Sequence, residues 1–136
     1  MTVVFDSYAW IEFFLGSDKG EKVRDIIMSE EDIITPSIVL AEVANKYYRE
    51  GVGEEIIKQR LNDITTISLI RYIDIDVLSK LGEAREIMLS NLKKRSIKSK
   101  PSLADYLVYA VSLVEEAMIV TGDEHFNGLK NVIYLK

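Results

Sequence analysis

Short apolar runs alternate along the chain with longer segments in which apolar residues recur every three or four positions. The short runs at residues 3–5, 33–34, 69–73, 117–121 and 132–134 have the length and composition of buried strands. The longer segments have the spacing of one buried helix face. They predict helices at residues 7–15, 18–29, 35–49, 54–63, 76–94 and 102–116, with a polar, basic loop at 95–100.

Several residues mark where these helices begin and end. Gly16 closes the first helix, and Asp76 is predicted to cap the long helix that follows the third strand. Thr35 and Pro36 predict a helix start, because threonine can cap a helix and proline fits its first turn. Ser102 is predicted to open the last long helix.

The alternation of strands and helices is typical of an α/β fold. Strands that are apolar throughout are typical of a parallel sheet that is buried on both faces. We therefore expect one domain over residues 1–136, with a mostly parallel sheet of about five strands covered by helices on both faces. In such sheets the active site forms beyond the carboxyl ends of the strands, where the strand order reverses.

The composition excludes several classes of site. The chain has 136 residues, one histidine, no cysteine and a formal net charge of −5. Disulfide scaffolds, zinc ribbons, thiol nucleophiles and two-histidine metal sites are therefore excluded. The sequence has no signal-peptide pattern and no apolar run of roughly 20 residues, so we expect a soluble, cytoplasmic protein without a membrane span. The acidic balance argues against a general polyanion binder, because such affinity depends on Lys and Arg.

Four carboxylates occupy positions that a parallel sheet can bring to one edge. Asp6 directly follows the first strand and Asp123 follows the fourth. Glu42 lies about one and a half turns into the helix that follows the second strand, and Asp105 lies in the first turn of the helix that leads into the fourth. For Asp105 to join the others, its helix must run beside the site. Each also has a purely structural explanation. Asp6, Asp105 and Asp123 can cap helices, and Glu42 can pair with Lys46 one turn later.

Taken together, these carboxylates predict a site for divalent cations. Carboxylates within a few ångströms repel one another, so such a cluster either raises some of its pKa values or binds cations. Oxygen ligands suit Mg²⁺ or Mn²⁺. The chemistry that such a site supports is metal-assisted phosphoryl transfer, in which the cation activates a water and offsets charge on the phosphoryl oxygens.

Four segments around these acids resemble the motifs of the PIN-domain family and, within it, of the VapC-type toxins of prokaryotic toxin–antitoxin pairs. The segments are Val4-Phe5-Asp6-Ser7-Tyr8-Ala9-Trp10-Ile11-Glu12, Leu40-Ala41-Glu42-Val43, Leu103-Ala104-Asp105-Tyr106-Leu107 and Val120-Thr121-Gly122-Asp123-Glu124-His125-Phe126. They occur in the family's order and span nearly the whole chain, which makes the resemblance more specific than any one motif.

This resemblance implies a three-layer α/β/α sandwich and a Mg²⁺- or Mn²⁺-dependent ribonuclease. It also implies an RNA substrate and an antitoxin protein as partner, and it favours a homodimer. Carried over position by position, it implies that the catalytic, metal-binding acids are Asp6, Glu42, Asp105 and Asp123, with Ser7 and Thr121 as supporting polar residues.

Two residues of these motifs need separate interpretation. Tyr106 stands where many members of the family have a smaller residue after the third acid, so we expect it to narrow or reshape the RNA groove. His125 lies two residues after the fourth acid. We interpret it as a helix-start or packing residue rather than a metal ligand, because the expected ligands are all oxygen atoms.

RNA binding by an acidic chain requires basic residues to be concentrated locally. Segment 93–100 contains no acid and carries five basic residues, Lys93, Lys94, Arg95, Lys98 and Lys100. It leads into the helix that bears Asp105, so it is a candidate for phosphate contacts beside the metal. The alternative is a solvated loop that contacts no RNA.

The first helix is apolar on two sides. One stripe consists of Tyr8, Ile11 and Leu15, and the other of Trp10, Phe13 and Phe14. One stripe can pack on the sheet, and the other then requires a neighbouring helix or another chain. An amphipathic antitoxin segment and a second copy of the chain are the candidates for such a partner.

Other α/β families fit the sequence less well. A dehalogenase-like phosphatase normally has a second Asp two residues after the first, where this chain has Tyr8. A receiver domain has paired acids at the first strand and a Lys after the fifth. A dinucleotide-binding domain requires a GxGxxG motif after the first strand. The alternative function is a PIN-like binding or scaffold module without nuclease activity, and the presence of all four acids argues against it.

Overall fold

A computed structural model describes residues 1–29 and 31–136, which contain a five-stranded sheet. The strand order is β3-β2-β1-β4-β5, and every neighbouring pair is parallel. The strands are β1 (Thr2–Phe5), β2 (Asp32–Pro36), β3 (Leu69–Arg71), β4 (Met118–Thr121) and β5 (Val132–Tyr134). The helices are α1 (Ser7–Leu15), α2 (Asp18–Met28), α3 (Ser37–Arg49), α4 (Glu54–Ile67), α5 (Ile75–Ser79), α6 (Leu81–Lys94), α7 (Leu103–Glu115) and the 3₁₀ helix η1 (Glu124–Phe126).

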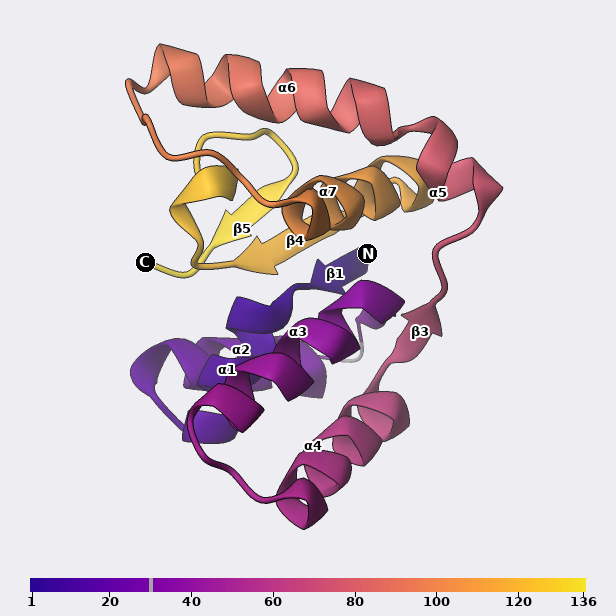
Figure 1. Ribbon diagram of the computed structural model, residues 1–136, viewed down its shortest axis with the longest axis vertical. Helices are drawn as coiled ribbons and strands as arrows, with labels where there is room; N and C mark the ends of the chain where they lie inside the picture. Colours follow the sequence, from indigo (N-terminus) through magenta and orange to yellow (C-terminus); the bar gives the residue numbers. More distant parts are fainter. Residues whose placement is uncertain (30) are drawn as a thin grey trace.

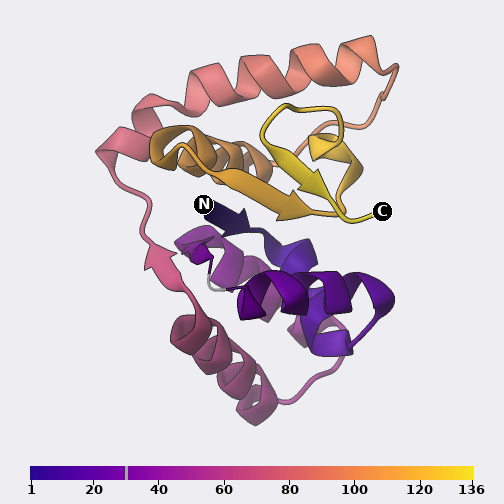
Figure 2. The same cartoon turned by 180° about the vertical axis from the view of Figure 1, so that it is seen from behind.

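Helices cover both faces of the sheet (Figures 1 and 2). Helices α1–α4 lie on one side, and α5, α6 and α7 lie on the other. The chain moves from β1 through β2 to β3 along one direction of the sheet, then returns through α5–α7 to place β4 on the other side of β1. The expected parallel α/β fold with two helical layers is confirmed, and the strand order reverses between β1 and β4.

The core lies between the central strands and the two helical layers. Val3, Val4 and Phe5 of β1 are fully buried, as an apolar strand between two layers must be. Helix α7 is buried throughout residues 106–112, because it lies beneath α5 and α6. Tyr106, expected to shape an RNA groove, is instead 8% exposed and packs into this core.

The second apolar stripe of α1 is covered by the chain's own residues. Trp10 is fully buried, and its ring lies edge-on to Phe5 with 5.1 Å between centroids. Phe13 and Phe14 pack beside it, and the Arg60 guanidinium of α4 lies 5.1 Å from the Phe14 ring centroid. No second chain is needed to cover this stripe.

The predicted cap of α3 is wrong. Thr35 and Pro36 belong to β2, and α3 begins at Ser37 without a side-chain cap. The Thr35 hydroxyl is used inside the core instead, where it accepts a hydrogen bond from Trp10 Nε1 at 3.0 Å and lies 2.7 Å from Ser68 Oγ. A buried threonine with these partners satisfies polar groups that would otherwise be costly to bury.

Three predicted boundaries between β2 and α7 also differ. Helix α4 continues beyond residue 63 to Ile67, because Ile64 is fully buried and packing outweighs the strand preference of the threonines that follow it. Strand β3 ends at Arg71 rather than at residue 73. The predicted helix 76–94 is two helices that meet at Lys80, and Asp74, not Asp76, caps the first.

None of the helices in residues 1–29 and 31–136 combines the length and the apolar character that a bilayer crossing requires.

Candidate metal centre

Asp6 joins β1 to α1 at the carboxyl edge of the sheet. It caps α1, because its Oδ1 accepts a hydrogen bond from the backbone N–H of Ala9 at 2.9 Å. Its Oδ2 accepts a hydrogen bond from the Thr121 hydroxyl of β4. The parallel register pairs Phe5 with Val120, so the residues that follow the two strands lie next to each other. Asp6 is only 5% exposed.

Asp123 lies at the end of the neighbouring strand and is held by the same hydroxyl. The backbone N–H of Asp123 donates to Thr121 Oγ1 at 3.0 Å, so Thr121 links the first and fourth acids. The Asp123 carboxylate caps η1 by accepting a hydrogen bond from the N–H of His125 at 2.9 Å. These two acids flank the point where the strand order reverses, which is where ligands bind in open parallel sheets.

Asp105 is fixed by the start of α7. Its N–H donates to Ser102 Oγ at 3.2 Å, and its own carboxylate accepts from the N–H of Ser102 at 2.9 Å, which completes a capping box. Its side chain is 15% exposed. The capping role expected from the spacing is therefore present, and it orients Asp105 at the edge of the site rather than excluding it from the site.

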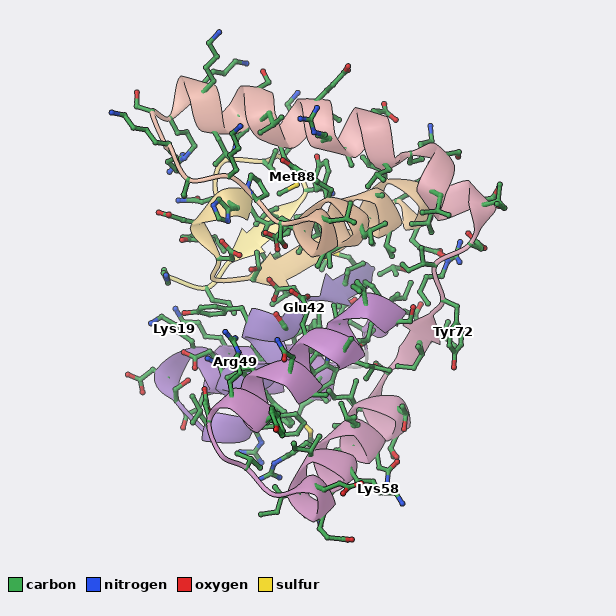
Figure 3. All side chains as sticks on the ribbon, in the orientation of Figure 1. Lys19, Glu42, Arg49, Lys58, Tyr72 and Met88 are labelled. Carbon is green, nitrogen blue, oxygen red and sulfur yellow. The ribbon has the colours of Figure 1, made fainter. Side chains whose placement is uncertain are left out.

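Glu42 lies on the side of α3 that faces β1 and the opposite helical layer (Figure 3). Its alternative role as a partner of Lys46 is not observed, because Lys46 pairs with Glu50 at 3.0 Å and no ion pair in the described ranges 1–29 and 31–136 includes Glu42. Helix α3 contacts both α1 and α7, so it places this carboxylate between the two layers.

The charges of the four acids act on one another. The pKa of Asp6 is raised to about 8, mainly by burial and also by the charges of Asp123 and Glu42, although the hydrogen bonds from Thr121 and Ala9 lower it. Burial also raises the pKa of Glu42 to about 7, and the charges of Asp105 and Asp123 act in the same direction.

The third acid responds in the same way. Burial and then the charge of Asp123 raise the pKa of Asp105, while the hydrogen bonds from Ser102 lower it. Each of the three perturbed acids therefore responds to at least one other member of the cluster. The structure brings together Asp6, Glu42, Asp105 and Asp123, which are far apart in the sequence.

This donor set fits a hard divalent cation. The four acids supply carboxylate oxygens, the ligands that Mg²⁺ and Mn²⁺ prefer. Within the described part of the chain, no Lys or Arg forms an ion pair with any of them. Carboxylates that are buried together without a basic partner are destabilised in their charged form, and a bound cation offsets this cost.

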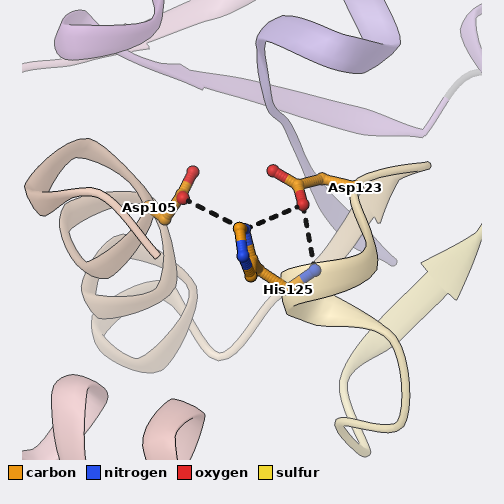
Figure 4. Close-up of side chains that lie close together, drawn as sticks. All are labelled: Asp105, Asp123 and His125. Carbon is orange, nitrogen blue, oxygen red and sulfur yellow. Dashed lines mark hydrogen bonds and ion pairs between the residues drawn. The ribbon is translucent and has the colours of Figure 1, made fainter. Parts of the chain in front are cut away.

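His125 lies in η1, in agreement with the helix-start interpretation, and its ring also lies beside two of the acids. Its Nδ1 is 3.1 Å from Asp123 Oδ1 and 3.8 Å from Asp105 Oδ2 (Figure 4). Nδ1 is buried and has no hydrogen-bond partner. One ligand-type atom from each of Asp105, Asp123 and His125 lies within 4.8 Å of the other two. The only signal in the sequence is that His125 follows Asp123 by two residues.

A groove of about 610 Å³ extends from the acids along α1 and α3. Asp6, Ser7 and Asp123 line its acidic end, and the apolar stripe with Tyr8 and Leu15 lines its wall. Leu15 is 70% exposed, so the chain leaves this end of the stripe open, although it buries Ile11.

Gly122 lets the groove keep its shape next to the end of β4. A Cβ atom at this position would lie 2.2 Å from the ring of Tyr8. The glycine in Thr121-Gly122-Asp123 therefore makes room for the aromatic residue that follows the first acid by two positions.

The basic segment 93–100 reaches the site through one hydrogen bond. Lys93, Lys94, Arg95, Lys98 and Lys100 are all exposed. Ser99 Oγ, between two of them, lies 3.0 Å from His125 Nε2. The segment is therefore next to the acid cluster, and its basic side chains remain open to solvent.

The comparison with family models is consistent with this geometry. The model described as "PIN domain" matches residues 3–131, which include all four acids and the whole sheet except Thr2 and strand β5. The chain belongs to the PIN domain family. This confirms the family expected from the four motifs, and the phosphatase, receiver and dinucleotide-binding alternatives are set aside.

Several solved structures with the same fold come from toxin–antitoxin systems. A toxin–antitoxin complex from Klebsiella pneumoniae aligns with a TM-score of 0.72 at 15% identity, over 98% of each chain. VapBC2 from Rickettsia felis, bound to a promoter DNA fragment, aligns with a TM-score of 0.70 at 17% identity, over 98% of this chain and 97% of that one. VapC20 of Mycobacterium tuberculosis, a toxin that cleaves the sarcin-ricin loop, aligns with a TM-score of 0.70 at 16% identity, over 96% of each chain. No curated protein matches the sequence directly.

Proposed function

We propose that this PIN protein is a divalent-metal-dependent endoribonuclease and the toxin of a toxin–antitoxin pair, acting in the cytoplasm. The observation that carries the proposal is the convergence at the switch point of the sheet of four acids, one buried and three half-buried, that form no ion pair with a Lys or Arg of the described residues. It is supported by the family match and by the toxins among the solved structures with this fold.

In this proposal the chain's residues hold and orient the reacting groups. Asp6, Glu42, Asp105 and Asp123 bind one or two Mg²⁺ or Mn²⁺ ions. A divalent cation held there would lower the pKa of a bound water and would offset the negative charge on the phosphoryl oxygens. The Thr121 hydroxyl holds Asp6 and the N–H of Asp123 in one arrangement, so the two central ligands keep their orientation.

RNA binding is assigned to the exposed basic segment beside the acids. Lys93, Lys94, Arg95, Lys98 and Lys100 can neutralise backbone phosphates, and the Ser99–His125 contact keeps this segment next to the site. Ser7, at the acidic end of the groove, is assigned a supporting polar role.

The antitoxin is assigned to the groove with the exposed apolar wall. Tyr8 and the exposed Leu15 present an apolar surface along the groove, which fits the apolar face of an amphipathic segment. Light scattering of the purified protein, alone and with the product of the adjacent gene, tests this assignment. A stable heteromeric complex supports it, whereas a homodimer that buries Leu15 assigns the same face to a second copy.

Nuclease assays test the catalytic part of the proposal. Asp6→Asn and Asp105→Asn are expected to lose RNA cleavage in Mg²⁺ or Mn²⁺, because each removes a charged metal ligand. Asp76→Asn is the matched control, since Asp76 is exposed and lies in α5, away from the carboxyl edge. Full activity in both site variants would eliminate the scheme.

Calorimetry separates the nuclease from the alternative of a binding or scaffold module. A nuclease of this design binds Mn²⁺ in the wild type and loses binding in Asp6→Asn. A scaffold has no reason to bind Mn²⁺, so a flat titration of the folded wild-type protein would favour the alternative.

A further inference from the structure

The ring of His125 is placed between two acids with one nitrogen unused. Nδ1 has no solvent contact and no hydrogen-bond partner, although Asp123 Oδ1 is 3.1 Å away and Asp105 Oδ2 is 3.8 Å away (Figure 4). Asp123 Oδ1 already accepts the backbone N–H of His125. A buried nitrogen without a partner is costly, so its position among the acids requires an explanation.

The opposite side of the ring indicates which nitrogen carries the proton. Ser99 Oγ is within reach of Glu124 Oε1 at 3.5 Å and of His125 Nε2 at 3.0 Å. A carboxylate can only accept, so a Ser99 hydroxyl that donates to Glu124 is left with its lone pairs to accept from Nε2–H. We therefore assign the proton to Nε2, which leaves the lone pair on Nδ1 directed at the acids.

We propose that His125 Nδ1 is a ligand of the divalent cation, together with Asp105 and Asp123, and that it makes the site prefer Mn²⁺ over Mg²⁺. The proposal rests on the proposed metal-dependent function and refines its metal centre. One ligand atom from each of the three residues lies within 4.8 Å of the others. Imidazole nitrogen suits transition metals, whereas Mg²⁺ prefers oxygen ligands.

The contact with Ser99 is what a ligating histidine requires. Histidine ligands generally donate their other N–H to an oxygen, which fixes the tautomer and the ring orientation. Ser99 lies in the segment 95–100 that precedes α7, so the same segment that carries the basic residues also orients the proposed ligand. The competing explanation is that His125 is a positively charged partner that offsets the acids and never binds metal.

Spectroscopy of bound Mn²⁺ separates the two explanations. The chain has a single histidine, so a directly bound nitrogen seen by pulsed electron paramagnetic resonance, in a buffer without nitrogen donors, can be assigned to His125. We expect this nitrogen coupling in the wild type and its loss in His125→Leu. Mn²⁺ that is bound without nitrogen coupling would overturn the proposal and leave the metal-dependent function standing.

Calorimetry provides the selectivity test. His125→Leu is expected to weaken Mn²⁺ binding by about tenfold or more, while Mg²⁺ binding changes by less than about threefold. His125→Asn, whose amide oxygen can replace Nδ1 as a donor, is expected to retain Mg²⁺ binding and to lose the preference for Mn²⁺. Ser99→Ala is the matched variant of the supporting residue, with a smaller loss of Mn²⁺ affinity.

The possible failures are distinguishable. If His125→Leu and the wild type bind Mn²⁺ and Mg²⁺ with the same ratio of affinities, His125 is not a selectivity ligand. If the folded wild type binds neither ion, the proposed function itself fails and this inference fails with it. Circular dichroism and thermal melting of each variant establish that the fold is intact.

Discussion

Asp6 caps α1 and is also a proposed metal ligand, and the two roles conflict: capping buries its carboxyl group, whereas binding a cation requires that group to be charged. As the cap of α1 it is buried at 5% exposure, and burial raises its pKa to about 8 from an ordinary value of 3.8. In the unfolded chain the carboxyl loses its proton near 3.8, whereas the folded, metal-free protein retains it until about pH 8. The unfolded state therefore binds fewer protons between these values, so this group makes the metal-free protein less stable as the pH rises.

This linkage predicts the behaviour of Asp6→Asn. In metal-free buffer at pH 7, the variant is expected to be more stable than the wild type by on the order of a few kcal/mol, because it no longer buries an ionisable carboxyl. The difference should shrink as the pH falls from 8 toward 4. Urea unfolding with a chelator, from pH 5 to pH 8, measures it.

The exposed acid Asp76 provides the control for this measurement. Asp76→Asn is expected to leave the pH dependence unchanged, and Mg²⁺ is expected to stabilise the wild type but not Asp6→Asn. If the wild type without metal instead became more stable relative to Asp6→Asn as the pH rises, the argument that burial destabilises the charged Asp6 carboxylate would be contradicted.

Sequence reasoning located these acids because strand ends have fixed places in a parallel sheet. Asp6 and Asp123 follow adjacent strands, so the topology brings them together. The place of His125 could not be predicted in the same way. It depends on the ring orientation, which is set by a contact with Ser99, 26 residues earlier in the chain, and no periodicity encodes that contact.

At the scale of elements, α1 and α2 pack directly against each other. Gly20 lies against α1, where a Cβ atom would be 2.0 Å from the backbone oxygen of Glu12. Backbone atoms cannot move aside as a side-chain end can, so this glycine sets the distance between the helices. Helix α1 also carries Asp6 at its start and the groove wall on one face, so its position affects both.

We predict that Gly20→Ala destabilises the protein by about 1–3 kcal/mol, because the methyl group forces α2 away from α1. Gly82→Ala is the matched control: Gly82 lies in α6, and a Cβ atom there would meet nothing within 4 Å. It is expected to be neutral or to stabilise by up to about 1 kcal/mol through helix propensity. Urea unfolding compares the two, and equal effects would show that the α1–α2 contact tolerates a methyl group.

The elements show where local sequence is sufficient and where packing decides. The strands and most helices follow from apolar spacing, because that spacing is what the two-sided burial of a parallel sheet requires. The break between α5 and α6 at Lys80 does not follow from this spacing, because Leu78 and Leu81 continue the apolar pattern across it. Ser79 and Gly82, both weaker helix formers than alanine, flank the break, and α5 packs against α7 while α6 continues beyond it.

At the scale of the whole molecule, the charge is divided between two neighbouring regions. The net charge is −5, yet the exposed basic segment 93–100 carries no acid and is tied to the acid cluster through Ser99 and His125. An RNA strand bound across this edge would meet basic side chains beside the acids that we propose as metal ligands. The affinity should therefore depend on a few local contacts rather than on the average charge.

Reversing the charges at Lys93, Lys94 and Arg95 tests this division. In an Asp105→Asn background, where RNA is expected to remain uncleaved, the triple change to Glu is expected to weaken binding and to flatten its salt dependence. Each lost phosphate contact on a single strand lowers the slope of log affinity against log salt by about 0.7, so three contacts correspond to about 2. Fluorescence anisotropy over a series of NaCl concentrations measures the slope.

The control reverses the same number of exposed charges elsewhere, at Lys58, Lys80 and Arg85. It changes the net charge of the protein by the same amount, so any effect of overall charge on affinity appears in both variants. A local phosphate contact predicts a flatter slope only for the change at residues 93–95. Equal slopes in the two variants would mean that the segment is a solvated loop, and the RNA path would then have to be sought along the groove of α1 and α3, beside Lys46 and Lys136.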